Sequence, residues 1–178
     1  KSLLCEYGFA NVWVNADSIN EKTFLSVFKQ RVVDCFCQKW YSDIQTNNVL
    51  NTLYVHVKES FCEEAYLTTG LPKSDRQSIT KLRISAHNLR IHTGRFGRNR
   101  IERHERVCEV CEEREVEDEF HFIFKCSRYQ HLRQKYIRTY FRVKPSMFKM
   151  IEMLKTTNKK MLMNLSRFIK EATKIRNE

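Results

Sequence analysis

The feature that most constrains this chain is a group of three cysteines and one histidine between residues 108 and 126. The stretch reads CEVCEEREVEDEFHFIFKC, which is a Cys-x2-Cys pair, nine residues, a histidine, four residues and a last cysteine. Thiolates and imidazoles are ligands of tetrahedral zinc, and structural zinc sites commonly take four protein ligands at this kind of spacing. We predict that one Zn²⁺ per chain is bound by Cys108, Cys111, His121 and Cys126.

The predicted zinc is structural, because four protein ligands leave no coordination position for water or substrate. The alternative interpretation is three buried thiols beside a helical histidine. Residues five apart on a regular α-helix point in different directions, so His121 and Cys126 can share an ion only if the helix loosens or ends near Lys125. The carboxylates at residues 117–119 favour a helix N-terminus just before His121.

The chain contains seven cysteines, an odd number that does not suit a secreted disulfide scaffold. The sequence therefore predicts reduced thiols in an intracellular setting, nuclear or cytoplasmic. Four cysteines lie outside the group at residues 108–126 and are expected to be buried as small hydrophobic side chains. They are Cys5, Cys35, Cys37 and Cys62.

Glycine and proline are scarce, with four and two copies in 178 residues, which favours helices over a sandwich or barrel. Apolar residues recur at steps of three and four, and this spacing predicts an all-α fold. Capping-box spacings place helix starts at Ser18–Glu21 and Ser74–Gln77. The expected helices span about 20–44, 49–66, 74–89, 127–140, 147–154 and 161–172. The expected regions are 1–73, 74–142 and 143–178, with a small zinc knuckle inserted between helices of the second.

The formal net charge of +11 lies in the second half of the chain. Residues 1–80 carry a net −1, residues 81–106 carry +6, residues 107–124 carry −6 and residues 125–178 carry +12. This asymmetry indicates RNA or DNA as a partner, and the acidic knuckle itself should repel phosphate. The alternative is a solvated basic surface. The candidate nucleic-acid-binding residues are Lys81, Arg83, Arg90, Arg95, Arg98, Arg100, Arg103 and Arg106. The longest apolar runs are only a few residues, so we expect no membrane partner.

The sequence resembles a known family in the stretch KLRISAHNLRIHTGRFGRNRIERHERVCEVCEEREVEDEFHFIFKCSRYQHLRQKY. This stretch is similar to the region after the polymerase domain in jockey-like, LINE-type (non-LTR) retrotransposon reverse transcriptases. The earlier LLCEYGFANVWVNADSINEKTFLSVFKQRVVDCFCQKWYSDI is similar to the helical connector that precedes that region. The resemblance implies a Cys-Cys-His-Cys knuckle that helps the enzyme engage RNA or target DNA. It also implies that the polymerase domain of the same polypeptide is a partner.

Important parts of that family are missing from this sequence. It contains no adjacent pair of aspartates, which the polymerase needs for its metal ions, and no carboxylate–lysine cluster typical of the associated nuclease. Because it also lacks an initiator methionine, we expect the chain to start partway through a longer polypeptide. We therefore predict a non-catalytic nucleic-acid-binding domain. The alternative is a helical module that docks on the polymerase or another protein.

Overall fold

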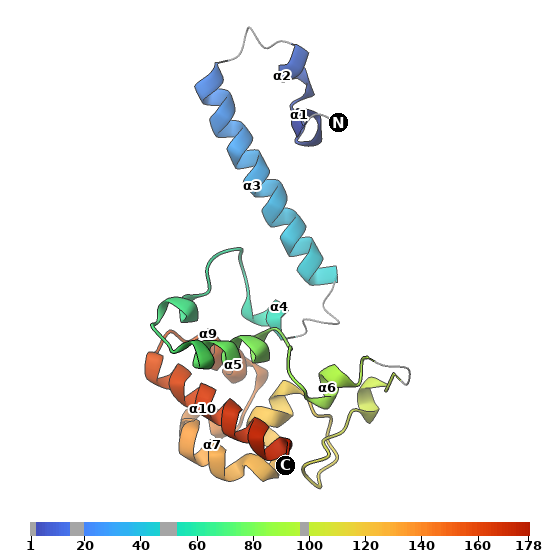
Figure 1. The fold of residues 1–178 in the computed structure, drawn as a ribbon, viewed down its shortest axis with the longest axis vertical. Coiled ribbons are helices and arrows are strands. Elements are labelled where there is room, and N and C mark those ends of the chain that lie inside the picture. Colours follow the sequence, from blue (N-terminus) through green and yellow to red (C-terminus); the bar gives the residue numbers. More distant parts are fainter. Residues whose placement is uncertain (1–2, 15–19, 47–52, 97–99) are drawn as a thin grey trace. The chain divides into compact units, whose positions relative to one another are not determined.

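The computed structural model describes residues 3–14, 20–46, 53–96 and 100–178. These residues form an all-α fold, in which the only pairing of strand type is an isolated bridge between Val107 and Val116 (Figure 1). Contacts divide the chain into two compact units, residues 1–47 and 48–178. This boundary differs from the expected one at residue 73, and the second and third expected regions share one unit. None of the described helices is both long and apolar enough to cross a bilayer.

The smaller unit contains three helices, α1 (Leu3–Glu6), α2 (Ala10–Val14) and α3 (Glu21–Thr46). The long helix was predicted at about this position. Its start is capped by Asn20, whose Oδ1 accepts a hydrogen bond from the Thr23 N–H at 3.1 Å. The predicted capping box includes Ser18, which lies outside the described residues. Edge-to-face ring contacts of Phe9 with two phenylalanines of α3 hold the unit together.

The cysteines outside residues 108–126 are less buried than predicted. Cys5 and Cys62 are exposed, and Cys35 and Cys37 are half-buried. The expectation of four buried thiols is therefore wrong, because the apolar neighbours of these residues are themselves partly exposed. On α3 the exposed large apolar side chains are Leu25, Val27, Val33, Phe36 and Tyr41.

The larger unit is built around the C-terminal helix α10, which packs against α5 and α7. Its core includes Leu162, Leu165 and Phe168 of α10, all at most 1% exposed. Each such side chain contributes about 1.5–3 kcal/mol when it leaves water. The helices of this unit are α4 (Tyr54–Val57), η2 (Ala65–Thr68), α5 (Lys73–Arg83), α6 (Arg90–Thr93), η3 (Arg103–Glu105), η4 (His121–Lys125), η5 (Ser127–Tyr129), α7 (Gln130–Tyr136), α8 (Thr139–Arg142), α9 (Met147–Lys155) and α10 (Lys159–Arg176).

The last two helices lie where the apolar spacing predicts them. Ser146 caps α9, since its hydroxyl accepts from the Lys149 N–H at 3.3 Å, and Asn158 caps α10 by accepting from the Met161 N–H at 3.0 Å. The 127–140 prediction is confirmed only in part, because this stretch forms the three short helices η5, α7 and α8.

Two predicted helices are shorter than expected. The 74–89 helix ends at Arg83, and Ser85 adopts a left-handed φ of 54° that an α-helix cannot contain. The capping box at Ser74–Gln77 is wrong, because the helix already begins at Lys73, after Pro72, without a side-chain cap.

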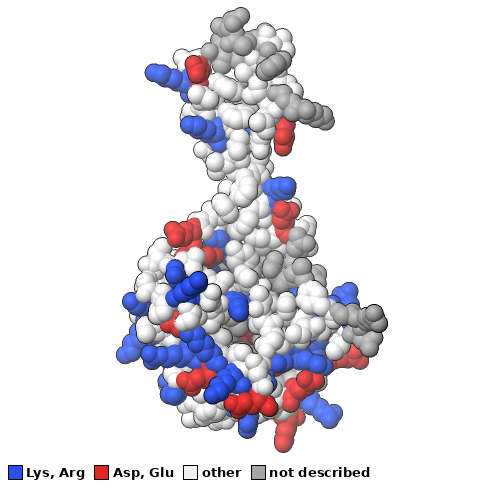
Figure 2. All heavy atoms as spheres, in the orientation of Figure 1, with Lys and Arg blue, Asp and Glu red and all other residues white. Residues whose placement is uncertain are grey.

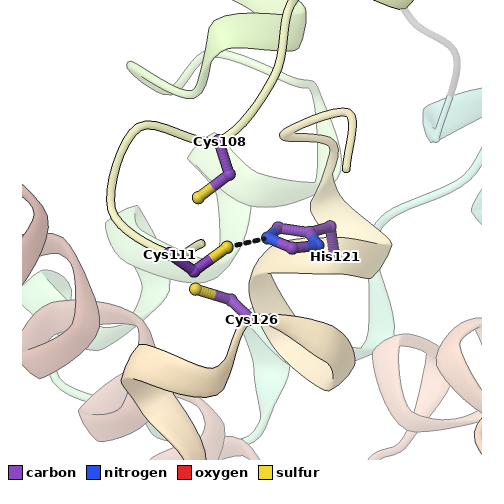
Figure 3. Close-up of side chains that lie close together, drawn as sticks. All are labelled: Cys108, Cys111, His121 and Cys126. Atoms are coloured by element: carbon purple, nitrogen blue, oxygen red, sulfur yellow. Dashed lines mark hydrogen bonds between the residues drawn. The ribbon is translucent and has the colours of Figure 1, made fainter. Parts of the chain in front are cut away.

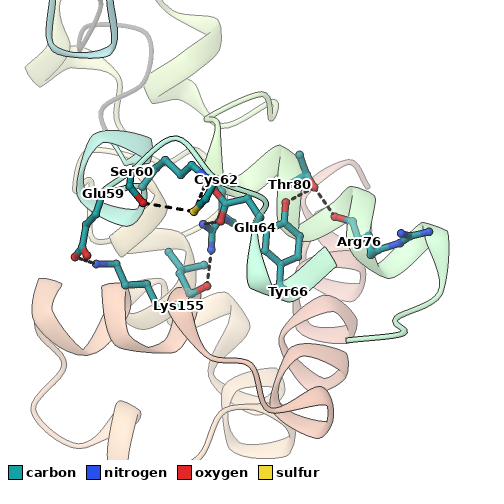
Figure 4. A network of polar contacts seen from close by, with 11 residues as sticks. Glu59, Ser60, Cys62, Glu64, Tyr66, Arg76, Thr80 and Lys155 are labelled. Atoms are coloured by element: carbon teal, nitrogen blue, oxygen red, sulfur yellow. Dashed lines mark hydrogen bonds and ion pairs between the residues drawn. The ribbon is translucent and has the colours of Figure 1, made fainter. Parts of the chain in front are cut away.

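The predicted 49–66 helix is reduced to α4 and the 3-10 turn η2, with a polar loop between them. Buried Lys58 donates to the Cys62 carbonyl and pairs with Glu64 at 3.1 Å, and Glu64 also pairs with Arg83 of α5 (Figure 4). The contacts of Lys58 lie within the loop, and the ion pair between Glu64 and Arg83 joins the loop to α5. The polar groups of the loop are therefore paired without a helix. The spacing of apolar residues alone does not reveal them.

Candidate metal centre

The four predicted ligands converge at one point in the larger unit (Figure 3). One ligand atom from each of Cys108, Cys111, His121 and Cys126 lies within 4.8 Å of all the others. Three of these residues are buried and Cys111 is half-buried. The group could hold a metal ion, which confirms the convergence predicted from the spacing.

A tight turn presents the first two ligands. The turn follows the bridge between Val107 and Val116, where the Cys108 N–H donates to the Glu115 carbonyl at 2.9 Å. Arg114 takes a left-handed φ of 51°, which lets the chain reverse within these few residues. The bridge fixes both ends of the turn, so Cys108 and Cys111 approach the centre from the same side.

A π-helical turn presents the other two ligands. The turn spans His121–Lys125, and it is closed by the Cys126 N–H donating to the His121 carbonyl at 2.9 Å. Such a bond joins residues five apart, whereas an α-helix joins residues four apart. The predicted loosening near Lys125 is thus confirmed. Asp118 caps the start of the turn, since its Oδ1 accepts from the His121 N–H at 2.8 Å.

The imidazole of His121 is oriented by a carboxylate. Its Nε2 lies 3.4 Å from the Cys111 Sγ, and its Nδ1 lies 3.2 Å from Oε2 of Glu115. A histidine that binds metal through one ring nitrogen commonly donates the other N–H to a carboxylate. Glu115 therefore favours the tautomer that is protonated at Nδ1. This tautomer leaves the lone pair of Nε2, on the side of the thiols, free to bind an ion.

The thiols share hydrogen bonds that move their acidities in opposite directions. The hydrogen bond with Cys126 lowers the pKa of Cys108 to about 3, whereas burial raises the pKa of Cys111 to about 12. The hydrogen bond with Cys108 raises the pKa of Cys126. Metal binding requires deprotonated thiols, so a bound ion would displace protons from Cys111 and Cys126.

Two carboxylates beside the centre are buried, not on an acidic surface as the sequence suggested. Glu117 is 1% exposed and forms a bidentate ion pair with Arg176 of α10, at 2.7 and 2.9 Å. Its Oε2 also accepts from the Arg90 N–H at 2.7 Å. Glu117 therefore joins the candidate metal-binding segment, residues 107–126, to α6 and α10, and sequence spacing gave no sign of this.

Glu119 makes a second connection, to the loop between α5 and α6. Its Oε1 accepts from the Ser85 hydroxyl at 2.6 Å and lies 2.9 Å from Nε2 of His87. Burial raises the pKa of Glu119, but hydrogen bonds from His87 and Ser85 outweigh burial and hold the pKa below its usual value. Of the three carboxylates at residues 117–119, only Asp118 has the predicted role at a helix start.

Two of the predicted nucleic-acid-binding arginines lie in the interior. Arg83 pairs with Glu64 and donates to the Leu154 carbonyl at 2.6 Å. Arg106 donates to the carbonyls of Ile91, at 3.1 Å, and Ile101, at 2.9 and 2.7 Å. Both guanidinium groups bind partners inside the protein and stabilise its fold, so these two residues are not available to bind nucleic acid.

The other candidates differ in exposure. Lys81, Arg100 and Arg103 are exposed. Arg90 pairs with Glu109 at 3.1 Å, and Arg95 is half-buried. Arg98 lies outside the described residues. The exposed cations of α10 were not among the candidates, although its charge run indicated them. They are Lys159, Lys160, Arg167, Lys170 and Lys174.

No protein-family model, curated protein or solved structure matches this chain.

Metal content is the direct test of the centre. We expect one metal ion per purified chain, and we expect Cys111→Ser to reduce this stoichiometry severely, because a hydroxyl is a poor replacement for a thiolate. Elemental analysis would measure both proteins, with Cys62→Ser as the matched control because that thiol is exposed and away from the cluster. Equal metal content in Cys111→Ser and the parent would contradict the ligand assignment.

Proposed function

We propose that this chain is a zinc-stapled, non-catalytic nucleic-acid-binding domain of a LINE-type reverse transcriptase. The metal would be Zn²⁺, because three thiolates and an imidazole form a soft, tetrahedral donor set that suits it. The family assignment rests on the sequence resemblance. The polymerase domain of the same polypeptide as a partner and an intracellular, reducing location belong to this proposal too.

The observation that carries the proposal is the basic surface of the unit that contains the metal centre. Residues 1–47 have five basic and five acidic side chains, so the net +11 belongs to residues 48–178. Lysine and arginine side chains are spread over the visible face of this unit, with fewer carboxylates among them (Figure 2). A surface of this charge attracts the phosphate backbone of a nucleic acid whatever its base sequence, since each neutralised phosphate releases counterions.

Arg100 and Arg103 are the residues best placed to bind phosphate near the metal centre. Both are exposed, and Arg103 lies in the short helix η3 directly before the bridge that carries Cys108. The guanidinium donates two parallel hydrogen bonds to phosphate, which a lysine cannot do. A metal-stabilised segment would therefore present these arginines in a fixed arrangement.

A salt titration tests the proposal. We expect the double variant Arg100→Ala/Arg103→Ala to bind short RNA and DNA more weakly, with a slope of log affinity against log salt that is flatter by about 1.5. Fluorescence anisotropy would measure both slopes. The control is Glu112→Gln, an exposed carboxylate near the metal centre whose loss should leave binding unchanged or stronger. Steep, unchanged slopes in the arginine variant would place the partner on another surface.

One observation favours the second candidate, a protein-interaction module. Around α8 and α9 several large apolar side chains are exposed, and Phe148 is 73% exposed. Binding through such a patch would follow apolar area and vary little with salt. The patch is formed by Tyr140, Val143, Met147 and Phe148.

A further inference from the structure

The α8–α9 patch, formed by Tyr140, Val143, Met147 and Phe148, is an exposed apolar surface of the larger unit. The exposed fractions of these four side chains run from 45% to 73%. Large apolar side chains that gather on a surface in this way mark interaction sites, whereas single ones do not. Aromatic residues and methionine are enriched in protein interfaces, and the flexible thioether of Met147 adapts to the shape of a partner. The composition of the patch therefore suits a protein partner.

Polar contacts between α8 and α9 hold the patch in place. The Lys149 ammonium donates to the carbonyls of Tyr140, at 2.8 Å, and Val143, at 2.6 Å, and it lies 4.8 Å from the centre of the Tyr140 ring. The Tyr140 hydroxyl donates to Oε2 of Glu152 at 3.0 Å. Phe148 and Glu152 are four residues apart on α9, so they lie on the same face of that helix. The patch is thus ordered before a partner binds, which lowers the entropic cost of binding.

The sequence around the patch is cationic. Residues 120–151 contain eight lysines and arginines and no aspartate or glutamate. Arg138, directly before α8, and Lys144, between α8 and α9, are exposed, and neither pairs with a carboxylate among the described residues. Glu152, the first carboxylate after this stretch, already accepts from Tyr140. An apolar surface beside unpaired cations is complementary to a partner that combines apolar side chains with carboxylates.

The form of the partner follows from the ways in which proteins bind peptides. An extended segment binds by adding a strand to the edge of a sheet, and the described residues contain no sheet. An amphipathic helix instead presents apolar side chains at steps of three and four along one face, with charged residues beside them. A nucleic-acid strand would meet the same cations, but the aliphatic side chains of Val143 and Met147 offer no ring on which a base can stack. An acidic amphipathic helix therefore fits the patch best.

We propose that the α8–α9 patch binds an acidic amphipathic helix of a partner protein, with Phe148 as an anchor and Arg138 and Lys144 paired with the partner's carboxylates. This inference rests on the second candidate function, the protein-interaction module, and names the chemistry of its partner. It depends on neither Arg100 nor Arg103, so it and the nucleic-acid-binding proposal can fail independently. Aromatic anchors dominate the affinity of an interface, whereas exposed ion pairs mainly orient the partner.

Fluorescence anisotropy of the metal-loaded, full chain with synthetic peptides tests this proposal. The probe is a peptide of about 15 residues, long enough to form a helix, with leucines along one face and glutamates on the others. Its matched control carries lysines in place of the glutamates. We expect the parent to prefer the acidic peptide, and we expect Phe148→Ala to weaken this binding by about thirtyfold. Arg138→Gln/Lys144→Gln should weaken it by about fivefold and remove its small dependence on salt, as the loss of two exposed ion pairs predicts.

The control variant is Phe61→Ala, at an exposed phenylalanine in the loop between α4 and η2, and it should bind the acidic peptide as the parent does. Thermal melting checks that each variant is folded. Equal binding of the two peptides by the parent, or parent-like binding of the acidic peptide by Phe148→Ala, would overturn the proposal.

Two other occupants of the patch have distinct outcomes, and each would also overturn the proposal. If Phe148→Ala weakens the binding of single-stranded RNA but not of the acidic peptide, the patch is a nucleic-acid surface. If the parent binds no peptide and sediments as a dimer that Phe148→Ala converts to a monomer, the patch joins two copies of this chain. Neither outcome would alter the result expected for the salt titration of Arg100→Ala/Arg103→Ala.

Discussion

Removal of the metal by a chelator is expected to disorder residues 107–129 while α9 and most of α10 stay folded. Structural zinc in small sites contributes roughly 10 kcal/mol or more to local folding, which exceeds what a bridge and a single helical turn can supply. Hydrogen exchange with and without chelator would measure this, residue by residue. Protection should fall most at Cys108 and Cys126, whose N–H groups bond within the metal-binding segment.

The expected survival of the remaining helices follows from the core. Leu154 of α9 and Leu162 of α10 have no exposed surface, and α10 packs on α5 independently of the thiols. Phe122 links the candidate ligands to this core, because it follows His121 directly and its ring centre lies 5.8 Å from that of Phe168. Protection should therefore also decrease around Phe168. Re-addition of Zn²⁺ is the control, and a uniform loss of protection along the whole chain would contradict this division.

The convergence of the four candidate ligands could be predicted from sequence because their geometry is local. Each ligand pair is separated by a few residues, and a turn or a helix end determines its spacing. Even the departure from α-helical geometry at His121 follows from the requirement that residues five apart share one ion. The bridge between Val107 and Val116 brings the pairs together, and it is formed within the same segment.

The roles of the charged residues could not be predicted in this way. Arg83 and Arg106 follow the same local pattern as the exposed arginines, yet both are buried because partners distant in sequence or in a loop accept their hydrogen bonds. The end of α5 depends likewise on Ser85, whose hydroxyl reaches Glu119 in the metal-binding segment. Such pairings depend on the tertiary fold, so they cannot be predicted from the spacing of residues in the sequence.

Replacement of Glu117 by alanine is expected to destabilise the larger unit by about 3–5 kcal/mol, the usual cost of removing one partner from a buried ion pair. Arg176, whose side chain is 14% exposed, would keep a charge without its carboxylate. The Arg90 N–H would lose its acceptor as well. Glu117→Gln should cost less, because it keeps an acceptor for that N–H.

Urea denaturation of the metal-loaded protein would measure these free energies, with metal content determined for each variant. The double variant Glu117→Met/Arg176→Met should recover much of the loss, since two apolar side chains leave no buried charge unpaired. Glu112→Ala, at an exposed position of the same segment, is the matched control and should change stability by less than about 0.5 kcal/mol. A Glu117→Ala protein as stable as this control would show that the ion pair with Arg176 does not hold the metal-binding segment to α10.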